Sequence, residues 1–284
     1  MSSNSGSSDG NRVCHPHIVD AGFPQRGKKI LSREQKIYPV MVSELSKKGS
    51  DDNEFFDDDG DFDNDSTGET QILTMEMLET AFLSQNPKSL PSAGFLAGRC
   101  QPELLEDRER LTTLLKETFA SLPVNALREK AVAYIEMAMS LALRGEVETA
   151  KDALQQVVTK KITAVGYVDL AAFYLAQLGD SSGYPAMIEA LNHKNEFNRL
   201  MATRHLIGFQ PYDGQTVGEH KVDIKAAFIK QLDDVNSYVQ EEVPFLMAEA
   251  EIEGLREILE NFCKRDISER ASESAQAVID ALEI

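Results

Sequence analysis

Apolar residues recur every three or four positions over most of this chain after about residue 70. Because an α-helix makes one turn in 3.6 residues, this spacing gathers apolar side chains along one side of a helix. Two stretches show it most clearly: Leu104, Leu105, Leu111, Leu115, Phe119 and Leu122, and then Leu127, Ala131, Tyr134, Ile135, Ala138, Leu141 and Ala142. We find no convincing period-two alternation, the mark of a half-buried strand, after Thr70. The sequence therefore predicts an all-α fold for this region.

Further helices are expected at 147–160, 166–178, 183–192, 196–208, 221–232, 235–248, 251–263 and 267–282. Polar residues that favour helix starts precede three of them. Ser182 comes before the helix that holds Pro185 in its first turn, and Asp266 with Glu269 fits a capping box. Asp233 and Asp234 are expected to cap the helix that follows them.

The charge of the chain limits its partners. Its 284 residues carry a formal net charge of −18, with a pI of about 4.7. Nucleic acids and anionic membranes need clustered Lys and Arg, so neither is an expected partner. The charge favours a partner protein with a basic surface. The alternative is that the negative charge only keeps the protein soluble.

Cysteine use and the N-terminus indicate the compartment. Cys14, Cys100 and Cys263 are odd in number and far apart, which argues against a disulfide framework. Residues 1–10 lack the apolar run of a signal peptide, and no stretch approaches 18 uninterrupted apolar residues. We expect a cytoplasmic protein.

Composition divides the chain into two expected domains, residues 1–70 and residues 71–284. The first is low in complexity and partly disordered by expectation, and its Asp-rich part, residues 50–70, is expected to be a disordered linker. Its Phe55, Phe56 and Phe62 could alternatively form an acidic docking motif with apolar anchors. The second is expected to be a helical domain.

An internal repeat organises the second region. Its first unit contains Leu170, Ala171, Ala172, Leu175, Ala176, Leu178, Gly179, Asp180, Gly183, Tyr184, Pro185, Ala186, Met187, Ile188, Ala190 and Leu191. A second unit follows about 30 residues later with Phe197, Arg199, Ala202, Leu206, Ile207 and Gly208. These residues resemble HEAT-like repeats of the kind also found in phycobilisome lyases. The resemblance implies an α-solenoid of stacked helix pairs, with irregular leading helices.

The resemblance is good over 165–208 and looser over 221–282. An insertion at 209–220 carries Phe209 and Tyr212, and it is either a contact loop or an ordinary elaborated turn. Upstream, Gly145 and Ala150 fit a tetratricopeptide-like turn.

Metal and cofactor sites are not expected. The alternating Asp57, Asp59, Asp61, Asp63 and Asp65 suggest calcium, but neither register supplies the Gly and Glu of an EF-hand loop. The cluster of Cys14, His15 and His17 lacks a fourth zinc ligand nearby.

Catalytic motifs are also missing from the sequence. It contains neither a nucleophile elbow nor a phosphate-binding Gly-rich loop. His205, within an expected helix, is interpreted as a seam or surface histidine. Phycobilisome lyases attach bilins, but only the repeat points to such chemistry here. We expect no enzyme.

Acidic residues concentrate near the C-terminus: 14 acidic and four basic residues lie between Asp233 and Glu283. We expect a non-catalytic, protein-binding solenoid, most concretely a bacterial immunity or inhibitor protein that neutralises a basic toxin or effector. The alternatives are an adaptor or chaperone, and a lyase-like enzyme on the same repeat. The candidate partner-binding residues are Glu241, Glu242, Glu249, Glu251, Glu253, Tyr212, Phe209, Phe55 and Phe56.

Overall fold

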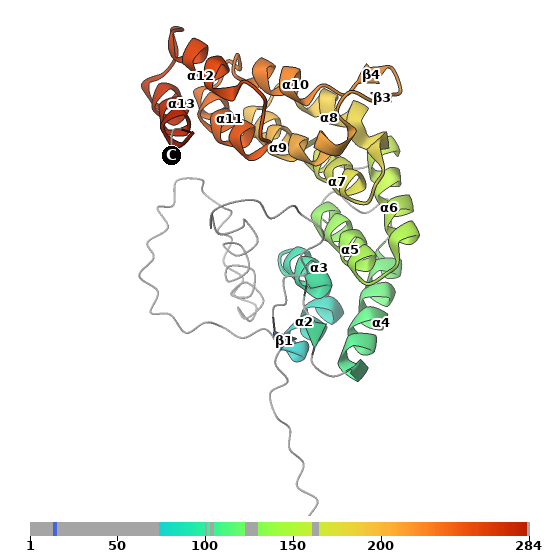
Figure 1. Cartoon of the computed structure of the whole chain (residues 1–284). Helices are drawn as coiled ribbons and strands as arrows, with labels where there is room; N and C mark the ends of the chain where they lie inside the picture. The colour runs from blue at the N-terminus through green and yellow to red at the C-terminus, as the bar shows by residue number, and fades with distance from the viewer. Residues whose placement is uncertain are drawn as a thin grey trace, which may run out of the picture. The chain divides into compact units, whose positions relative to one another are not determined.

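The computed structural model describes residues 14–15, 74–99, 101–102, 105–122, 130–160 and 165–282 (Figure 1). Twelve α-helices and only two-residue strands lie in these ranges, which confirms the all-α prediction. Contacts divide the chain into two compact units, an N-terminal unit of residues 1–146 and a C-terminal unit of residues 147–284. This boundary falls inside residues 71–284, which the sequence suggested as one domain.

The N-terminal unit contains α2 (Met75–Ser84), α3 (Leu90–Arg99), α4 (Leu105–Ser121) and α5 (Ala131–Leu143). The short strands β1 (Cys14–His15) and β2 (Gln101–Pro102) pair antiparallel. Helix α3 packs closely against α5, while α2 packs against α4. The N-terminal acidic and Phe-rich stretch, including Phe55 and Phe56, lies outside the described residues.

Helix α3 forms although Gly94 and Gly98 lower its intrinsic propensity. Both glycines are buried, and the absence of a side chain lets the backbones of α3 and α5 approach closely. Ser140 of α5 donates its hydroxyl to the carbonyl of Gly94 across this contact. Tertiary packing therefore stabilises a helix that glycine content alone disfavours.

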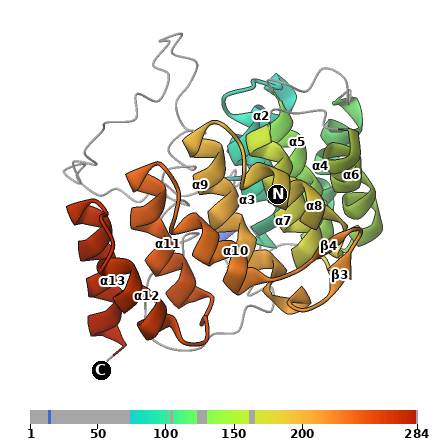
Figure 2. The same cartoon turned by 90° about the horizontal axis from the view of Figure 1, so that it is seen from above.

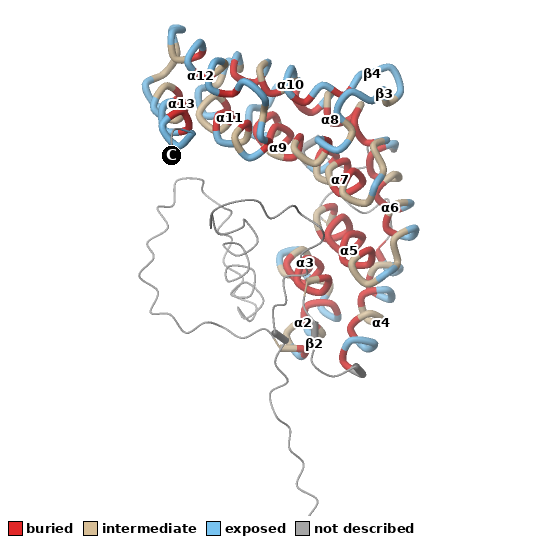
Figure 3. Tube along the Cα trace, in the orientation of Figure 1, coloured by how far each residue is buried: buried red, intermediate tan, exposed pale blue. Residues whose placement is uncertain are grey.

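The C-terminal unit holds eight α-helices: α6 (Val147–Lys160), α7 (Val165–Gln177), α8 (Tyr184–Ala190), α9 (Glu196–His205), α10 (Ile224–Gln231), α11 (Ser237–Glu249), α12 (Leu255–Cys263) and α13 (Glu269–Ala281). They lie close to the eight ranges expected from periodicity. Helices α7, α9, α11 and α13 pack in sequence as one layer, and α8, α10 and α12 form a second layer beside it (Figures 1 and 2). Buried positions alternate with exposed ones along these helices (Figure 3).

Two predicted caps are wrong. Asn236 caps α11 by accepting a hydrogen bond from the Tyr238 N–H at 2.9 Å, and Ser268 caps α13 by accepting from the Ala271 N–H at 3.1 Å. Asp234 lies two residues before this cap, and its carboxylate accepts from Arg199 and from the Asn236 N–H at 2.8 Å. Pro185 does lie in the first turn of α8, as predicted, but Ser182 lies inside the short 3₁₀ helix η2 (Ser181–Gly183) and no side chain caps α8.

The predicted insertion at 209–220 is folded back on the unit. Its first part belongs to the 3₁₀ helix η3 (Leu206–Tyr212), and its end forms a hairpin of β3 (Thr216–Val217) and β4 (His220–Lys221). Phe209 is fully buried and packs its ring near that of Tyr184. The Tyr212 hydroxyl donates to the Ala176 carbonyl at 2.9 Å. Phe209 and Tyr212 therefore pack against the unit, whereas the β3–β4 hairpin is largely exposed.

No helix among the described residues is long and apolar enough to cross a membrane.

Candidate functional site

Helices α9 and α11 begin in the same way. Asn195 caps α9 by accepting from the Asn198 N–H at 3.2 Å, as Asn236 caps α11. Two residues after each cap stands an aromatic side chain, Phe197 in α9 and Tyr238 in α11. Both are more than half exposed, at 57% and 55%. The two neighbouring helices thus present corresponding aromatic side chains to solvent.

Carboxylates share the outward side of α11 with aromatic residues. Tyr238, Glu241, Glu242, Phe245 and Glu249 follow one another at intervals of one to four residues that place them on one side of the helix. The opposite side carries Val239, Val243 and Met247, which are fully buried. Phe245 is 50% exposed. We call Phe197, Tyr238, Phe245, Glu241, Glu242 and Glu249 the aromatic–acidic face.

An ion pair joins the two helices on this face. The Arg204 guanidinium of α9 lies 3.0 Å from the Glu242 carboxylate of α11. Both side chains are about one-third exposed, so the pair contributes little to stability, about 0.2–1 kcal/mol. Its main consequence is geometric, because it shows that the outward sides of α9 and α11 adjoin.

A buried ion pair holds the starts of the same two helices together. The Arg199 guanidinium donates from Nε and Nη2 to both Asp234 oxygens at 2.6 and 2.7 Å. Its Nη1 donates to the carbonyls of His193 and Lys194 at 2.8 and 3.2 Å. Arg199 therefore connects the turn before α9, the helix of Phe197, to the turn before α11, the helix of Tyr238.

Hydrogen bonds also set the ionisation of two carboxylates in this unit. Burial by itself would raise the pKa of Asp234, but hydrogen bonds from Arg199 and the Asn236 N–H, with the charge of Arg199, lower it overall. Burial likewise opposes ionisation of Asp180, whose pKa is lowered by hydrogen bonds from Ser182 and Gln155 and by the charge of Lys151.

These lowered pKa values predict acid destabilisation. A carboxyl with a lower pKa in the folded state stabilises that state above its ordinary pKa of 3.8, and this contribution is lost as the pH falls through the folded-state value. We expect the urea midpoint to decrease as the pH falls below 3.8. Asp180→Asn should show a shallower decrease over that range, and an unchanged slope in this variant would contradict the assignment.

The partner-binding residues predicted from the sequence do not all lie on one surface. It brings Glu241, Glu242 and Glu249 together on α11, but Glu251 and Glu253 lie in the turn between α11 and α12. Phe209 is 0% exposed and has no surface with which to contact a partner. Tyr212 is half-buried, with its hydroxyl engaged by Ala176.

The aromatic members of the face were missed by sequence reasoning. The sequence analysis includes Phe197 only as a residue of the second repeat unit, and it names neither Tyr238 nor Phe245. The pattern Asn, any residue, then an aromatic occurs at 195–197 and 236–238, each at a helix start, but also at 53–55, so it does not by itself mark an exposed aromatic residue.

His205 lies in the core and pairs with a buried carboxylate. Its Nδ1 is 2.7 Å from Asp169 Oδ2, and its ring stacks on Phe173 with centroids 5.0 Å apart. This agrees with a seam histidine, although His205 Nε2 and Asp169 Oδ1 are buried without a hydrogen-bond partner. A histidine that is 2% exposed cannot reach a substrate from this position.

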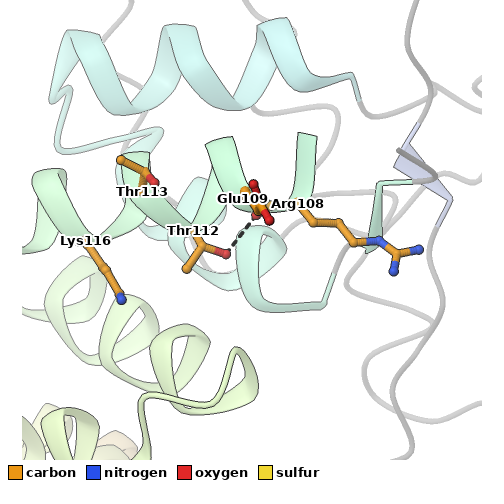
Figure 4. Close-up of a pocket in the computed structure, with 5 residues that line it drawn as sticks. All are labelled: Arg108, Glu109, Thr112, Thr113 and Lys116. Atoms are coloured by element: carbon orange, nitrogen blue, oxygen red, sulfur yellow. Dashed lines mark hydrogen bonds between the residues drawn. The ribbon is translucent and has the colours of Figure 1, made fainter. Parts of the chain in front are cut away.

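A shallow hollow in the N-terminal unit lies along α4 and is lined by Arg108, Glu109, Thr112, Thr113 and Lys116 (Figure 4). Thr112 donates its hydroxyl to the Arg108 carbonyl at 2.8 Å and accepts from Arg144 at 3.2 Å. Lys116 pairs with Glu146 at 2.5 Å. The lining comes from a single exposed helix, and its polar groups serve helix contacts.

Among the described residues, no group of three or more His, Cys, Asp or Glu side chains is placed to hold a metal ion. The cluster of Cys14, His15 and His17 and the Asp-rich stretch lie outside the side chains that are described. The chain matches no family model, no curated protein and no solved structure. The HEAT-like resemblance therefore stays a prediction.

Proposed function

We propose that this chain is a non-catalytic protein-binding module that recognises a basic partner through the aromatic–acidic face. The observation that carries the proposal is the exposure of Phe197, Tyr238 and Phe245 among carboxylates on two adjoining helices. Aromatic side chains are enriched at binding hot spots, and complementary charge speeds and orders association. A row of stacked helices of the HEAT-like type is the fold that we propose for this unit.

The most concrete form of the proposal is an immunity or inhibitor protein that masks a basic toxin or effector enzyme. The net charge of −18 supports it, since a polyanionic surface can occupy the cationic site with which such an enzyme holds its own substrate. In this form we place the protein in the cytoplasm, bound to one partner.

The test is capture of partners from native lysate, followed by mass spectrometry and a salt titration. We expect one stoichiometric, basic protein whose affinity falls steeply with salt. Several loosely held partners would instead favour an adaptor, and a co-purifying chromophore would favour a lyase-like enzyme.

Charge reversal locates the surface. Glu241→Lys with Glu249→Lys is expected to weaken binding of the captured partner by about tenfold or more, because each reversal replaces an attraction by a repulsion. The matched control is Glu251→Lys with Glu253→Lys, which changes net charge equally but lies in the α11–α12 turn. Equal losses in both double variants, measured by titration calorimetry, would mean that the face has no special role.

A further inference from the structure

The aromatic–acidic face has a more specific chemistry than negative charge alone. We infer that it binds a cationic amphipathic α-helix of the partner, an inference that rests on the protein-binding function proposed above. Phe197, Tyr238 and Phe245 contact the apolar side of that helix, and Glu241 and Glu249 pair with its Lys or Arg residues. This is recognition of a helix that lies across the adjoining outward sides of two helices.

The aromatic side chains have the spacing that such a helix needs. Tyr238 and Phe245 are seven residues apart on α11, which is two turns or about 10 Å along the axis. An approaching helix repeats its apolar side chains at the same interval. Phe197 adds an anchor on the adjoining α9, and the turn before α11 adds Val235, which is 95% exposed.

The charges around these anchors select a cationic occupant. Glu273 stands five residues after the cap of α13, as Glu241 does after the cap of α11, and α11 packs against α13. Within α9, α11 and α13 the exposed or half-exposed Lys and Arg residues are Arg204, which is paired with Glu242, and Arg270, and Lys194 lies in the turn before α9. A second copy of this chain would bring like charges together, and nucleic acid or anionic lipid would be repelled.

Backbone chemistry favours a helix over an extended strand as the bound element. The face consists of helix sides, whose backbone N–H and C=O groups are already paired within α9 and α11. It offers no open sheet edge on which an extended peptide could add a strand. A bound strand would therefore leave its own backbone groups without protein partners, whereas a helix pairs them internally.

The inference is tested with the full chain and a synthetic probe. The probe is a fluorescently labelled Leu–Lys peptide of about 18 residues with Leu at the positions of an amphipathic helix. A second peptide has the same composition in an order that destroys the apolar side. We expect saturable binding of the first, at least about tenfold tighter than binding of the second, by fluorescence anisotropy. Equal affinities, or no saturable binding of the first peptide, would overturn the inference.

Surface variants identify the contact. Replacing both aromatic residues, Tyr238→Ser with Phe245→Ser, is expected to lower the affinity for the first peptide by about tenfold or more, because aromatic hot-spot residues dominate such contacts. Leu83→Ser is the matched control, since Leu83 is an exposed apolar residue of α2 in the other unit. Circular dichroism checks that the variants stay folded. Retained affinity in the aromatic double variant would overturn the inference.

The two proposals fail in different ways. If binding of the captured natural partner is lost on reversal of Glu241 and Glu249 but not on removal of Tyr238 and Phe245, the chain binds a basic protein without the aromatic contacts inferred here. If the partner is insensitive to both sets, the face is not the binding surface.

Discussion

Replacement of Arg199 by alanine is expected to lower the free energy of unfolding by about 3–5 kcal/mol, because it leaves the Asp234 carboxylate buried without its partner. The Asp234 side chain is only 5% exposed, and after loss of the two bonds from Arg199 its carboxylate keeps the bond from the Asn236 N–H. The variant also frees the His193 and Lys194 carbonyls from their donor. Urea unfolding followed by circular dichroism measures the change.

Arg204→Ala is the matched control. It removes the same residue type from the same helix, and it also breaks a pair with a carboxylate associated with α11. Because Arg204 and Glu242 remain in contact with water, the expected loss is below about 1 kcal/mol. Similar losses in the two variants would show that burial of the Arg199–Asp234 pair does not decide its contribution.

Gly98→Ala is expected to lower the free energy of unfolding by about 1–3 kcal/mol. An added Cβ would lie 2.6 Å from Ser140 Cα, which is backbone and cannot rotate away. Alanine is the better helix former by about 0.5–1 kcal/mol, so intrinsic propensity alone predicts a gain. We expect the clash to exceed that gain and α3 to separate from α5. Urea unfolding measures whether the free energy of unfolding falls or rises.

Gly94→Ala, one turn earlier in α3, provides the comparison. Its Cβ would lie 3.0 Å from Met137 Cγ, a flexible side-chain atom that can move, and 3.3 Å from the Met137 N. The gain in helix propensity and the cost of this milder steric contact should nearly cancel, so the free energy of unfolding should change little. A stabilised Gly98→Ala variant would contradict the close approach of α3 and α5.

The acidic residues of the candidate site could be anticipated from the sequence, but its aromatic residues could not. The acidic run on α11 was evident from composition, and three of its five candidate glutamates do share one face. The aromatic partners were overlooked because an exposed Tyr238 and a buried Phe209 look alike in a sequence. Nothing local distinguishes the Phe that packs against Tyr184 from the one that faces solvent.

Helix caps show the same limit. Asp233, Asp234 and Asn236 are all good capping residues before α11, so propensity leaves the choice open. In the structure Asn236 is the cap, while the Asp234 carboxylate accepts from Arg199, 35 residues away, and from the Asn236 N–H. The choice among the three residues is visible only in the folded chain.

The sequence by itself determined the all-α class, the approximate extents of the helices in the C-terminal unit, and the acidity that points to a basic partner. These are local or compositional properties, and the 3.6-residue period expresses them directly. Only the tertiary structure decided that α3 forms around Gly94 and Gly98, that Phe209 lies in the core, and that Phe197 of α9 joins Tyr238 and Phe245 of α11. Each of these depends on which helix surfaces meet, because contacts between residues far apart in the chain set burial.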